Sequence, residues 1–259
     1  MDHPPKMESG LQVGDRAPEG GGLSDFARGW LPDDIWSGPH FDAMRARFAE
    51  HPLRLITIDG GFAEDKLLRI ESWCREARYR EEYALCDEAR QLGDQQGRGV
   101  HVNSEAWSAA PEKRRFFRFS SALPPDNPSP GANSYLDFAI LMADAGWRRL
   151  LEALTGMELG APSVEIHRLG QGDFIGLHSD ARSNRRLGLI AYCHPVWEQD
   201  WGGCYRIEDG LGGTFDIMPR FNRMIIFDVA AHRAHRVTPV ATSRPRYSLN
   251  VWFHAPDAG

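Results

Sequence analysis

The spacing of hydrophobic and polar residues changes character near residue 160. Before that point, apolar residues predict four regular segments, which are helices at 41–50, 63–79 and 134–159 and a buried strand at 52–62. The inward face of the second helix is expected to consist of Leu67, Leu68, Ile70 and Trp73. We expect the third helix to end near Gly156. The less regular stretch from 80 to 134 predicts a strand and then a Pro-rich loop.

After residue 160, short strand-like runs with turn residues between them replace the helical periodicity. The eight runs are SVEIHRL, FIGLHSD, RRLGLIAYCH, GGCYRIED, GTFDIMP, RMIIFDV, AHRVTPV and RYSLNVWF. Short strands at a spacing of about 8 to 12 residues are typical of a jelly roll or a small barrel. We therefore predict an α+β protein with an all-β core at about 160–259 and helical and strand support at about 25–159.

Length and charge bound the organisation of the chain and its partners. A chain of 259 residues can form one well-cored domain or two small ones, and we expect one, over residues 25–259. Residues 1–24 are rich in Gly, Pro and charge and predict a disordered tail. The net charge of −6, without long runs of like charge, argues against nucleic-acid or membrane-surface binding. No oligomeric state is predicted.

Cysteine usage and hydropathy indicate the compartment. The 4 cysteines have no CxxC spacing, so reduced, buried thiols fit them better than a disulfide framework or a zinc knuckle. No apolar run approaches the roughly 18–20 residues of a membrane span, and the N-terminus lacks the apolar stretch of a secretion signal. We expect a soluble, cytoplasmic protein with no membrane partner.

A candidate metal site begins with the pattern His-x-Asp, which occurs twice in the chain. His40 and Asp42 lie in a predicted helix, where Asp42 would sit in the first turn and suit the helix dipole. His178 and Asp180 lie in a predicted strand, whose alternation puts both side chains on one face. Two histidines and one carboxylate on one face of a metal leave positions open for a cosubstrate and O2, as in non-heme Fe(II) oxygenases.

The third ligand of such a site would have to come from another strand. His235 opens an alternating run that follows the apolar MIIFDV, so it can face inward, across the barrel from the strand of His178. The alternative is His232, in the segment that connects these runs. His194 and His254 are expected at the surface or in supporting positions.

The last run places a cation on the same inner face. In RPRYSLNVWF, alternation puts Arg246, Ser248, Asn250 and Trp252 on one side. A guanidinium inside an apolar barrel needs an anionic partner, and Arg is suited to bidentate binding of a carboxylate, to which Ser248 can add a hydroxyl donor. The alternatives are a salt bridge to an Asp of the barrel, or an outward-facing Arg246.

Four segments together resemble a known family. RLGQGDFIGLHSD, IAYCHPVWEQDWGGCYRI, PRFNRMIIFDVAAHRAHRVTPV and RPRYSLNVWF, in this order, look like the Fe(II)/2-oxoglutarate-dependent dioxygenases, specifically the prolyl-hydroxylase-like branch. The resemblance covers about residues 160–259 and implies a cupin-like double-stranded β-helix. It also implies Fe(II), with 2-oxoglutarate and O2 as cosubstrates and ascorbate as a candidate reductant.

The resemblance assigns roles by position. His178, Asp180 and His235 match the iron ligands. Arg246 matches the residue that binds the distal carboxylate of 2-oxoglutarate, supported by Ser248, and Tyr192 matches a tyrosine whose hydroxyl reaches that carboxylate. The assigned residues are therefore His178, Asp180, His235, Arg246, Ser248 and Tyr192, with Arg244 as the alternative to Arg246. Two departures concern the substrate, since His194 stands where the branch often has Asn and Arg168 where it often has a pocket Tyr.

The implied activity is hydroxylation of an unactivated C–H bond of an amino-acid-type substrate, peptidyl or small, with oxidative decarboxylation of 2-oxoglutarate to succinate and CO2. The alternatives are a non-catalytic jelly-roll metal- or ligand-binding or sensor protein and a zinc hydrolase of cupin type. Arg246 and Ser248 behind the metal motif argue against them, because neither needs a buried carboxylate site.

Two sets of residues near the predicted site bear on the substrate. Three arginines after the metal motif either form a solvated loop or contact an anionic substrate; they are Arg182, Arg185 and Arg186. Three tryptophans either line the mouth of the site or serve in packing, which is the commoner role of such residues; they are Trp107, Trp197 and Trp201.

Overall fold

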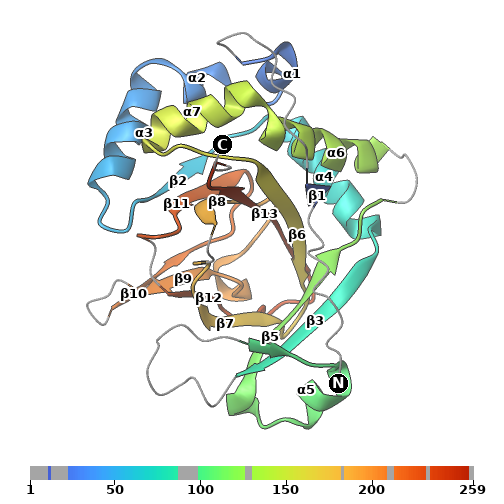
Figure 1. Ribbon diagram of the computed structural model, residues 1–259. Helices are drawn as coiled ribbons and strands as arrows, with labels where there is room; N and C mark the ends of the chain where they lie inside the picture. The colour runs from blue at the N-terminus through green and yellow to red at the C-terminus, as the bar shows by residue number, and fades with distance from the viewer. Residues whose placement is uncertain are drawn as a thin grey trace.

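A computed structural model describes residues 11–12, 23–86, 99–125, 130–181, 184–208, 213–231 and 234–256. It consists of a curled antiparallel sheet with most helices gathered on one side and one short helix, Ser104–Ala109, at the opposite end (Figure 1). The α-helices are α1 (Asp25–Arg28), α2 (Asp33–Trp36), α3 (Gly38–Glu50), α4 (Glu64–Glu76), α5 (Ser104–Ala109), α6 (Pro130–Ala143) and α7 (Ala145–Thr155). Short 3-10 helices occupy Glu112–Arg114 and Gln199–Trp201.

The sheet contains five strands from the first part of the chain and eight from the second. The first five are β1 (Leu11–Gln12), β2 (Leu55–Asp59), β3 (Tyr79–Cys86), β4 (Gly99–His101) and β5 (Arg115–Ala122). The others are β6 (Pro162–Leu169), β7 (Phe174–His178), β8 (Arg185–Ala191), β9 (Tyr205–Glu208), β10 (Thr214–Ile217), β11 (Arg223–Asp228), β12 (His235–Val237) and β13 (Arg246–His254). Each of the eight predicted runs after residue 160 therefore contains a strand.

The strand order is β10-β9-β12-β7-β5-β6-β13-β8-β11-β2. The four strands at one end face the five at the other across a barrel interior, and β5 joins the two groups. This arrangement agrees with the predicted jelly-roll core. Because β2 pairs with β11 and β5 pairs with β6 and β7, the support and the core share one sheet.

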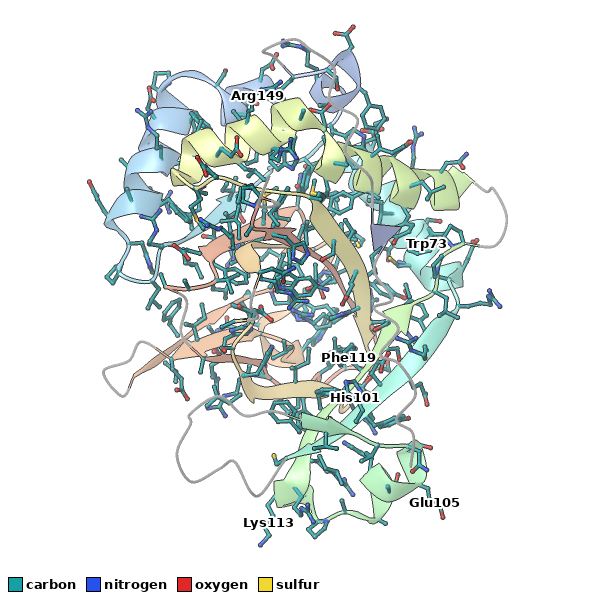
Figure 2. All side chains as sticks on the ribbon, in the orientation of Figure 1. Trp73, His101, Glu105, Lys113, Phe119 and Arg149 are labelled. Carbon is teal, nitrogen blue, oxygen red and sulfur yellow. The ribbon has the colours of Figure 1, made fainter. Side chains whose placement is uncertain are left out.

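Side-chain alternation divides the buried residues into two clusters. Along β13, Leu249 and Phe253 point to the helical side, where they join Trp147 of α7 and other helix residues. The barrel interior holds a second cluster, which includes Tyr192 and Phe227. Figure 2 places Trp73 of α4 on the helical side, whereas His101, Glu105 and Lys113 mark the part of the molecule that projects away from the barrel.

The predicted long helix is two helices. Asp144 separates α6 from α7, because its carboxylate accepts a hydrogen bond from the backbone N–H of Trp147 at 2.8 Å and so caps α7. The same carboxylate accepts the Ser24 hydroxyl at 2.6 Å. α7 ends at Thr155, near Gly156 as predicted, and Gly156 caps it with a φ of 71°, where a side chain would be strained.

Two further details of the helices differ from the sequence prediction. Leu68 of α4 is 43% exposed, while Leu67, Ile70 and Trp73 are buried, so the inward face is narrower than predicted. α3 begins at Gly38, which leaves Asp42 beyond the first turn, where it pairs with Arg45 at 3.2 Å. The reason is that Pro39 suits the first helical turn and starts the helix earlier than the apolar spacing indicates.

The N-terminal tail, the cysteines and the helix lengths were also predicted from the sequence. Leu11–Gln12 pairs with β6, so these two residues of the predicted disordered tail are in a strand, and nearly all of the rest lies outside the described residues. All four cysteines are free, with Cys86 partly exposed and the other three buried. Among the described helices, none has the length and apolar character needed to span a membrane.

Candidate metal centre and carboxylate site

His178 and His235 lie directly opposite each other on two adjacent strands. His178 ends β7 and His235 begins β12, and the antiparallel register pairs the two residues. Their ring centroids are 4.3 Å apart. His235 was predicted to lie across the barrel from His178, but it comes from the neighbouring strand. Residues opposite each other in an antiparallel pair share a face, so the two rings still lie on the same side of the sheet.

Asp180 follows β7 and completes the group. Its carboxylate oxygens lie 3.8 Å from Nε2 of His178 and 3.6 Å from Nε2 of His235. One ligand atom from each of the three residues lies within 4.8 Å of the others, and no second group of this kind occurs in the part of the chain that the structure describes. We call these residues the triad. His40 and Asp42 belong to no such group, and His232 lies outside the described residues.

The donors of the triad suit a divalent metal. Nδ1 of His178 lies 2.8 Å from the backbone carbonyl of Gly176. A carbonyl can only accept, so Nδ1 carries the proton and Nε2 is left with the lone pair that a metal requires. Two imidazoles and one carboxylate are the donor set of a facial 2-His-1-carboxylate site. The residues present therefore fit Fe(II).

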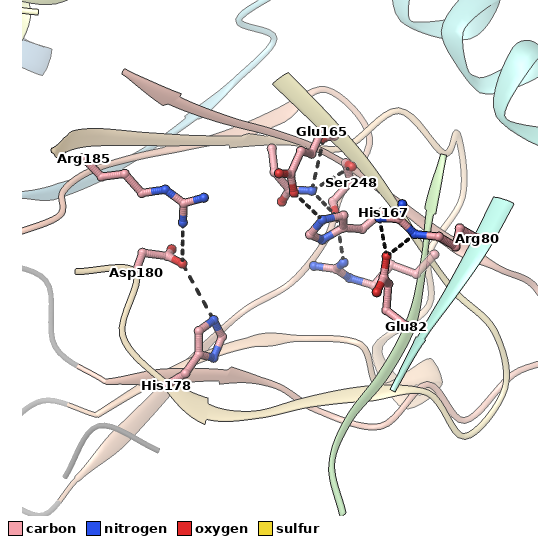
Figure 3. A network of polar contacts seen from close by, with 10 residues as sticks. Arg80, Glu82, Glu165, His167, His178, Asp180, Arg185 and Ser248 are labelled. Carbon is pink, nitrogen blue, oxygen red and sulfur yellow. Dashed lines mark hydrogen bonds and ion pairs between the residues drawn. The ribbon is translucent and has the colours of Figure 1, made fainter. Parts of the chain in front are cut away.

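Arg185 supports the triad from the side. Its guanidinium lies 3.7 Å from the Asp180 carboxylate (Figure 3) and 3.8 Å from the ring centroid of Trp252. The side chain is only 10% exposed, so a fully solvated loop is the wrong description of Arg185. Arg186 is exposed, and Arg182 lies outside the described residues.

Arg246 lies inside the barrel and is 2% exposed. Its guanidinium donates hydrogen bonds to the carbonyl of Gly203 at 2.8 Å, to the hydroxyl of Ser248 at 3.2 Å and to the hydroxyl of Tyr192 at 3.0 Å. No carboxylate of a described residue lies within 4.0 Å of it. Both alternatives, an outward-facing side chain and a salt bridge, are therefore excluded for the described residues.

The two hydroxyls next to Arg246 are oriented as donors. Ser248 accepts hydrogen bonds from Arg246 and from the Asn250 amide, and Tyr192 accepts one from Arg246. Each hydroxyl therefore keeps its own proton for a further acceptor. Burial raises the pKa of Tyr192, which opposes the effect of Arg246, so the phenol stays protonated. We call Arg246, Tyr192 and Ser248 the Arg246 cluster.

Gly203 makes the approach of Arg246 possible. Its φ is 64°, and a Cβ at this position would lie 2.8 Å from Cδ of Arg246. Only glycine meets both conditions without strain. Arg244, the alternative to Arg246, is exposed and lies 5.4 Å from the Trp201 ring, outside the barrel.

Sequence reasoning missed one group on the inner wall. His167 of β6 is opposite Ser248 of β13, is 9% exposed and lies 3.1 Å from the Glu165 carboxylate (Figure 3). Alternation along SVEIHRL could have revealed it, because residues 165, 167 and 169 share a face. Arg168, predicted to occupy a pocket position, points outward and lies 5.4 Å from the Tyr79 ring.

The three tryptophans serve in packing. Trp107 of α5 is buried below Arg115 at 4.4 Å. Trp197 stacks on His194 at 4.7 Å and meets Trp201 edge-on at 5.5 Å. His194 is itself buried, so of the two positions expected for it, the surface is excluded.

The part of the chain that contains the triad and the Arg246 cluster is similar to known proteins. Residues 164–254 match the family model of the 2OG-Fe(II) oxygenase superfamily. Prolyl 3-hydroxylase sudestada1 of Drosophila melanogaster is 29% identical over 120 residues, and prolyl 3-hydroxylase OGFOD1 of Xenopus laevis is 29% identical over 116 residues. These alignments cover 41% and 42% of this chain but 22% and 23% of the relatives, so the chain spans under a quarter of their length.

Solved structures share the fold at low sequence identity. A prolyl-4-hydroxylase of Pseudomonas putida has a TM-score of 0.56 at 16% identity, over 83% of this chain and 100% of its own. A 2OG-Fe(II) oxygenase family oxidoreductase of Burkholderia pseudomallei has a TM-score of 0.52 at 17% identity, over 94% and 95%. These likenesses confirm the predicted jelly-roll fold.

The core of the chain, residues 164–254, is thus similar to the 2OG-Fe(II) oxygenase superfamily. The similarity to two prolyl 3-hydroxylases also confirms the predicted resemblance to the prolyl-hydroxylase-like branch.

Proposed function

We propose that the protein is an Fe(II)- and 2-oxoglutarate-dependent oxygenase that hydroxylates an unactivated C–H bond of a peptidyl amino acid. The observation that carries the proposal is Arg246, a buried cation that has no carboxylate partner among the described residues and lies between two hydroxyl donors. A buried charge without a counter-charge is strongly unfavourable, so this position requires an anionic ligand. The triad supplies the metal chemistry that such a ligand would serve.

Different residues of the chain would bind the metal and the cosubstrate. His178, Asp180 and His235 would hold the metal, and the Arg246 cluster would hold the distal carboxylate of 2-oxoglutarate. When bound, iron supplies oxidation of the target C–H by O2, coupled to decarboxylation of 2-oxoglutarate to succinate and CO2. Arg185 orients the Asp180 carboxylate, and the apolar interior around Tyr205 and Phe227 excludes water.

Two observations support a peptidyl substrate. The named relatives are prolyl 3-hydroxylases, which makes peptidyl proline the first side chain to test. A cavity of about 620 Å³ borders Arg185, and its wall includes the exposed Arg186. An acidic residue of a chain lying in this cavity could pair with Arg186.

The test begins without turnover. The purified protein is mixed with Fe(II) and 2-oxoglutarate under anaerobic conditions, and the weak visible charge-transfer band of the chelate is measured. Succinate formation is then followed with proline-containing peptides. A band that depends on the triad, with peptide-stimulated succinate, is the expected result. Absence of both would exclude the oxygenase and leave a binding or sensor protein, whereas a band without succinate for any peptide would exclude the peptidyl substrate.

A further inference from the structure

Aromatic rings lead away from the triad, beginning at one of its metal ligands. The ring centroid of Tyr205 lies 4.6 Å from that of His235. Tyr205 is 1% exposed and belongs to the same buried cluster as Tyr192. Burial raises the pKa of Tyr205 well above its usual value, and the nearby Asp180 and Tyr192 raise it further. Tyr205 therefore lies close both to the triad and to the Arg246 cluster.

From Tyr192 the rings continue outward to the surface. His194 stacks on Tyr192 at 5.8 Å and on Trp197 at 4.7 Å, and Trp197 meets Trp201 edge-on at 5.5 Å. Centroid separations of about 4.5–7 Å are those of aromatic rings in contact. His194 is buried, whereas Trp197 and Trp201 are partly exposed. We call these rings the aromatic row, which consists of Tyr205, Tyr192, His194, Trp197 and Trp201.

Most rings of the aromatic row can be oxidised by one electron. Phenol and indole rings lose an electron more easily than phenyl or imidazole rings, because a heteroatom lone pair enriches the ring. Electronic coupling falls steeply with distance, so an electron moves faster between rings in contact than in one long step. Burial and the nearby charge of Arg246 lower the pKa of His194 to about 3. This ring is therefore neutral and adds no positive charge that would oppose oxidation of its neighbours.

The need for such a row follows from the proposed function, on which this inference rests. The reaction of O2 with 2-oxoglutarate leaves two oxidising equivalents at the metal, and a substrate C–H bond normally consumes them. When no substrate is bound, the same equivalents attack nearby side chains unless another source of electrons reaches the metal first. An enzyme of this kind therefore benefits from a path that excludes this competing reaction.

We propose that the aromatic row carries electrons from the surface to the oxidised metal when no substrate is bound. For each electron that moves inward, Trp201 loses its indole proton to water and becomes a neutral radical. A reductant such as ascorbate then returns one electron and one proton to Trp201. Two such steps, with two protons taken up from water at the metal, restore Fe(II) and release one molecule of water. Arg244 lies 5.4 Å from the Trp201 ring, and its positive charge favours the approach of an anionic reductant.

The experiment uses the full-length protein loaded with Fe(II) and 2-oxoglutarate, which is mixed with O2 in the absence of peptide. Succinate is measured in the same sample, and frozen samples are examined by electron paramagnetic resonance. We expect a tryptophan radical, whose signal narrows when the protein contains ring-deuterated tryptophan. Ascorbate should remove the signal. Without ascorbate, mass spectrometry after longer exposure should find Trp201 oxidised.

Two substitutions of Trp197 test the path. Trp197→Phe introduces a ring that is not oxidised, so the radical should stay on tyrosine and its signal should narrow with ring-deuterated tyrosine instead. Trp197→Tyr keeps an oxidisable ring and should restore the tryptophan radical. Both variants lose the hydrogen bond that the Trp197 indole N–H donates to the carbonyl of Gly202 at 2.9 Å. A merely structural role of Trp197 would therefore affect the two variants equally.

Trp73→Phe is the matched control. Trp73 is 6% exposed and stacks on Tyr135 at 4.7 Å on the helical side, so its loss should leave the radical signal unchanged. Succinate formation without a protein radical, or an unchanged tryptophan signal in Trp197→Phe, would overturn the proposal. Oxidation of Trp252 in place of Trp201 would also overturn it, because the oxidising equivalents would then leave by another side chain. Absence of succinate would overturn the oxygenase function itself, and this inference with it.

Discussion

The triad and the Arg246 cluster are assembled in different ways, although both lie in the barrel. The Arg246 cluster is built from side chains joined by hydrogen bonds of 3.0 to 3.2 Å, and it lacks only a counter-charge. In the triad, the carboxylate lies 3.6 to 3.8 Å from the two imidazoles, beyond hydrogen-bond length, so no direct hydrogen bond joins it to either ring. The Arg246 cluster is therefore organised before its ligand binds, whereas the triad depends on its metal to join its side chains.

The largest effect should come from removing a ligand of the triad. Asp180→Ala should lower Fe(II) affinity by more than about 100-fold, since even loss of a supporting group commonly costs 10- to 100-fold. Metal titration followed by the anaerobic charge-transfer band measures it. Asp42→Ala is the control, because Asp42 has the same His-x-Asp spacing on exposed α3. Equal loss in the two variants would mean that the triad is not the metal site.

Truncating Arg246 should change the affinity for 2-oxoglutarate and leave the affinity of the triad for metal unchanged. Arg246→Ala should weaken 2-oxoglutarate binding by about 2–5 kcal/mol, or about 30-fold or more, with Fe(II) affinity retained. Arg246→Lys should restore little of it, because an ammonium cannot bind a carboxylate in a bidentate manner. Isothermal titration with each ligand gives both affinities.

The control for Arg246 is Arg206→Ala, which removes an exposed guanidinium paired with Asp216 at 2.6 Å. This variant should bind both ligands normally. If Arg246→Ala lost iron and 2-oxoglutarate in parallel, the two regions would have to be regarded as one unit.

Acid should lower the free energy of unfolding of the protein through His194, which stacks on Tyr192 of the Arg246 cluster. The folded pKa of His194, about 3, lies below the unfolded value of 6.5, so the unfolded chain binds the extra proton. The contribution of neutral His194 to the free energy of unfolding is therefore fully present above pH 6.5. Below pH 6.5 the free energy of unfolding falls by about 1.4 kcal/mol per pH unit, or about 2 kcal/mol at pH 5. Urea unfolding of wild type and His194→Phe between pH 7 and 5 measures this difference. Parallel pH profiles would show that His194 does not titrate in this way.

The smallest effect should come from a single hydroxyl. Tyr192→Phe keeps the ring and removes one donor to the bound carboxylate, which should weaken 2-oxoglutarate binding by about 0.5–1.5 kcal/mol. The measurement is the titration used for Arg246. A loss as large as that of Arg246→Ala would indicate that Tyr192 holds the guanidinium in place, rather than adding one bond.

Local alternation was sufficient to predict the eight core strands and the inward direction of Arg246 and Ser248. It could not predict that His235 pairs with His178, because the register of β7 and β12 depends on strands distant in sequence. It also could not show that Asp144 caps a new helix. These features depend on which elements pack together, which the residues of one segment do not specify.

The position of β5 has a consequence for folding. This strand precedes the core in sequence by some forty residues, yet it pairs with both β6 and β7, and β2 pairs with β11. The sheet therefore closes only when distant parts of the chain have met, which is a slow, cooperative step. A fragment starting at residue 160 would expose the unpaired edges of three strands, and such edges promote aggregation.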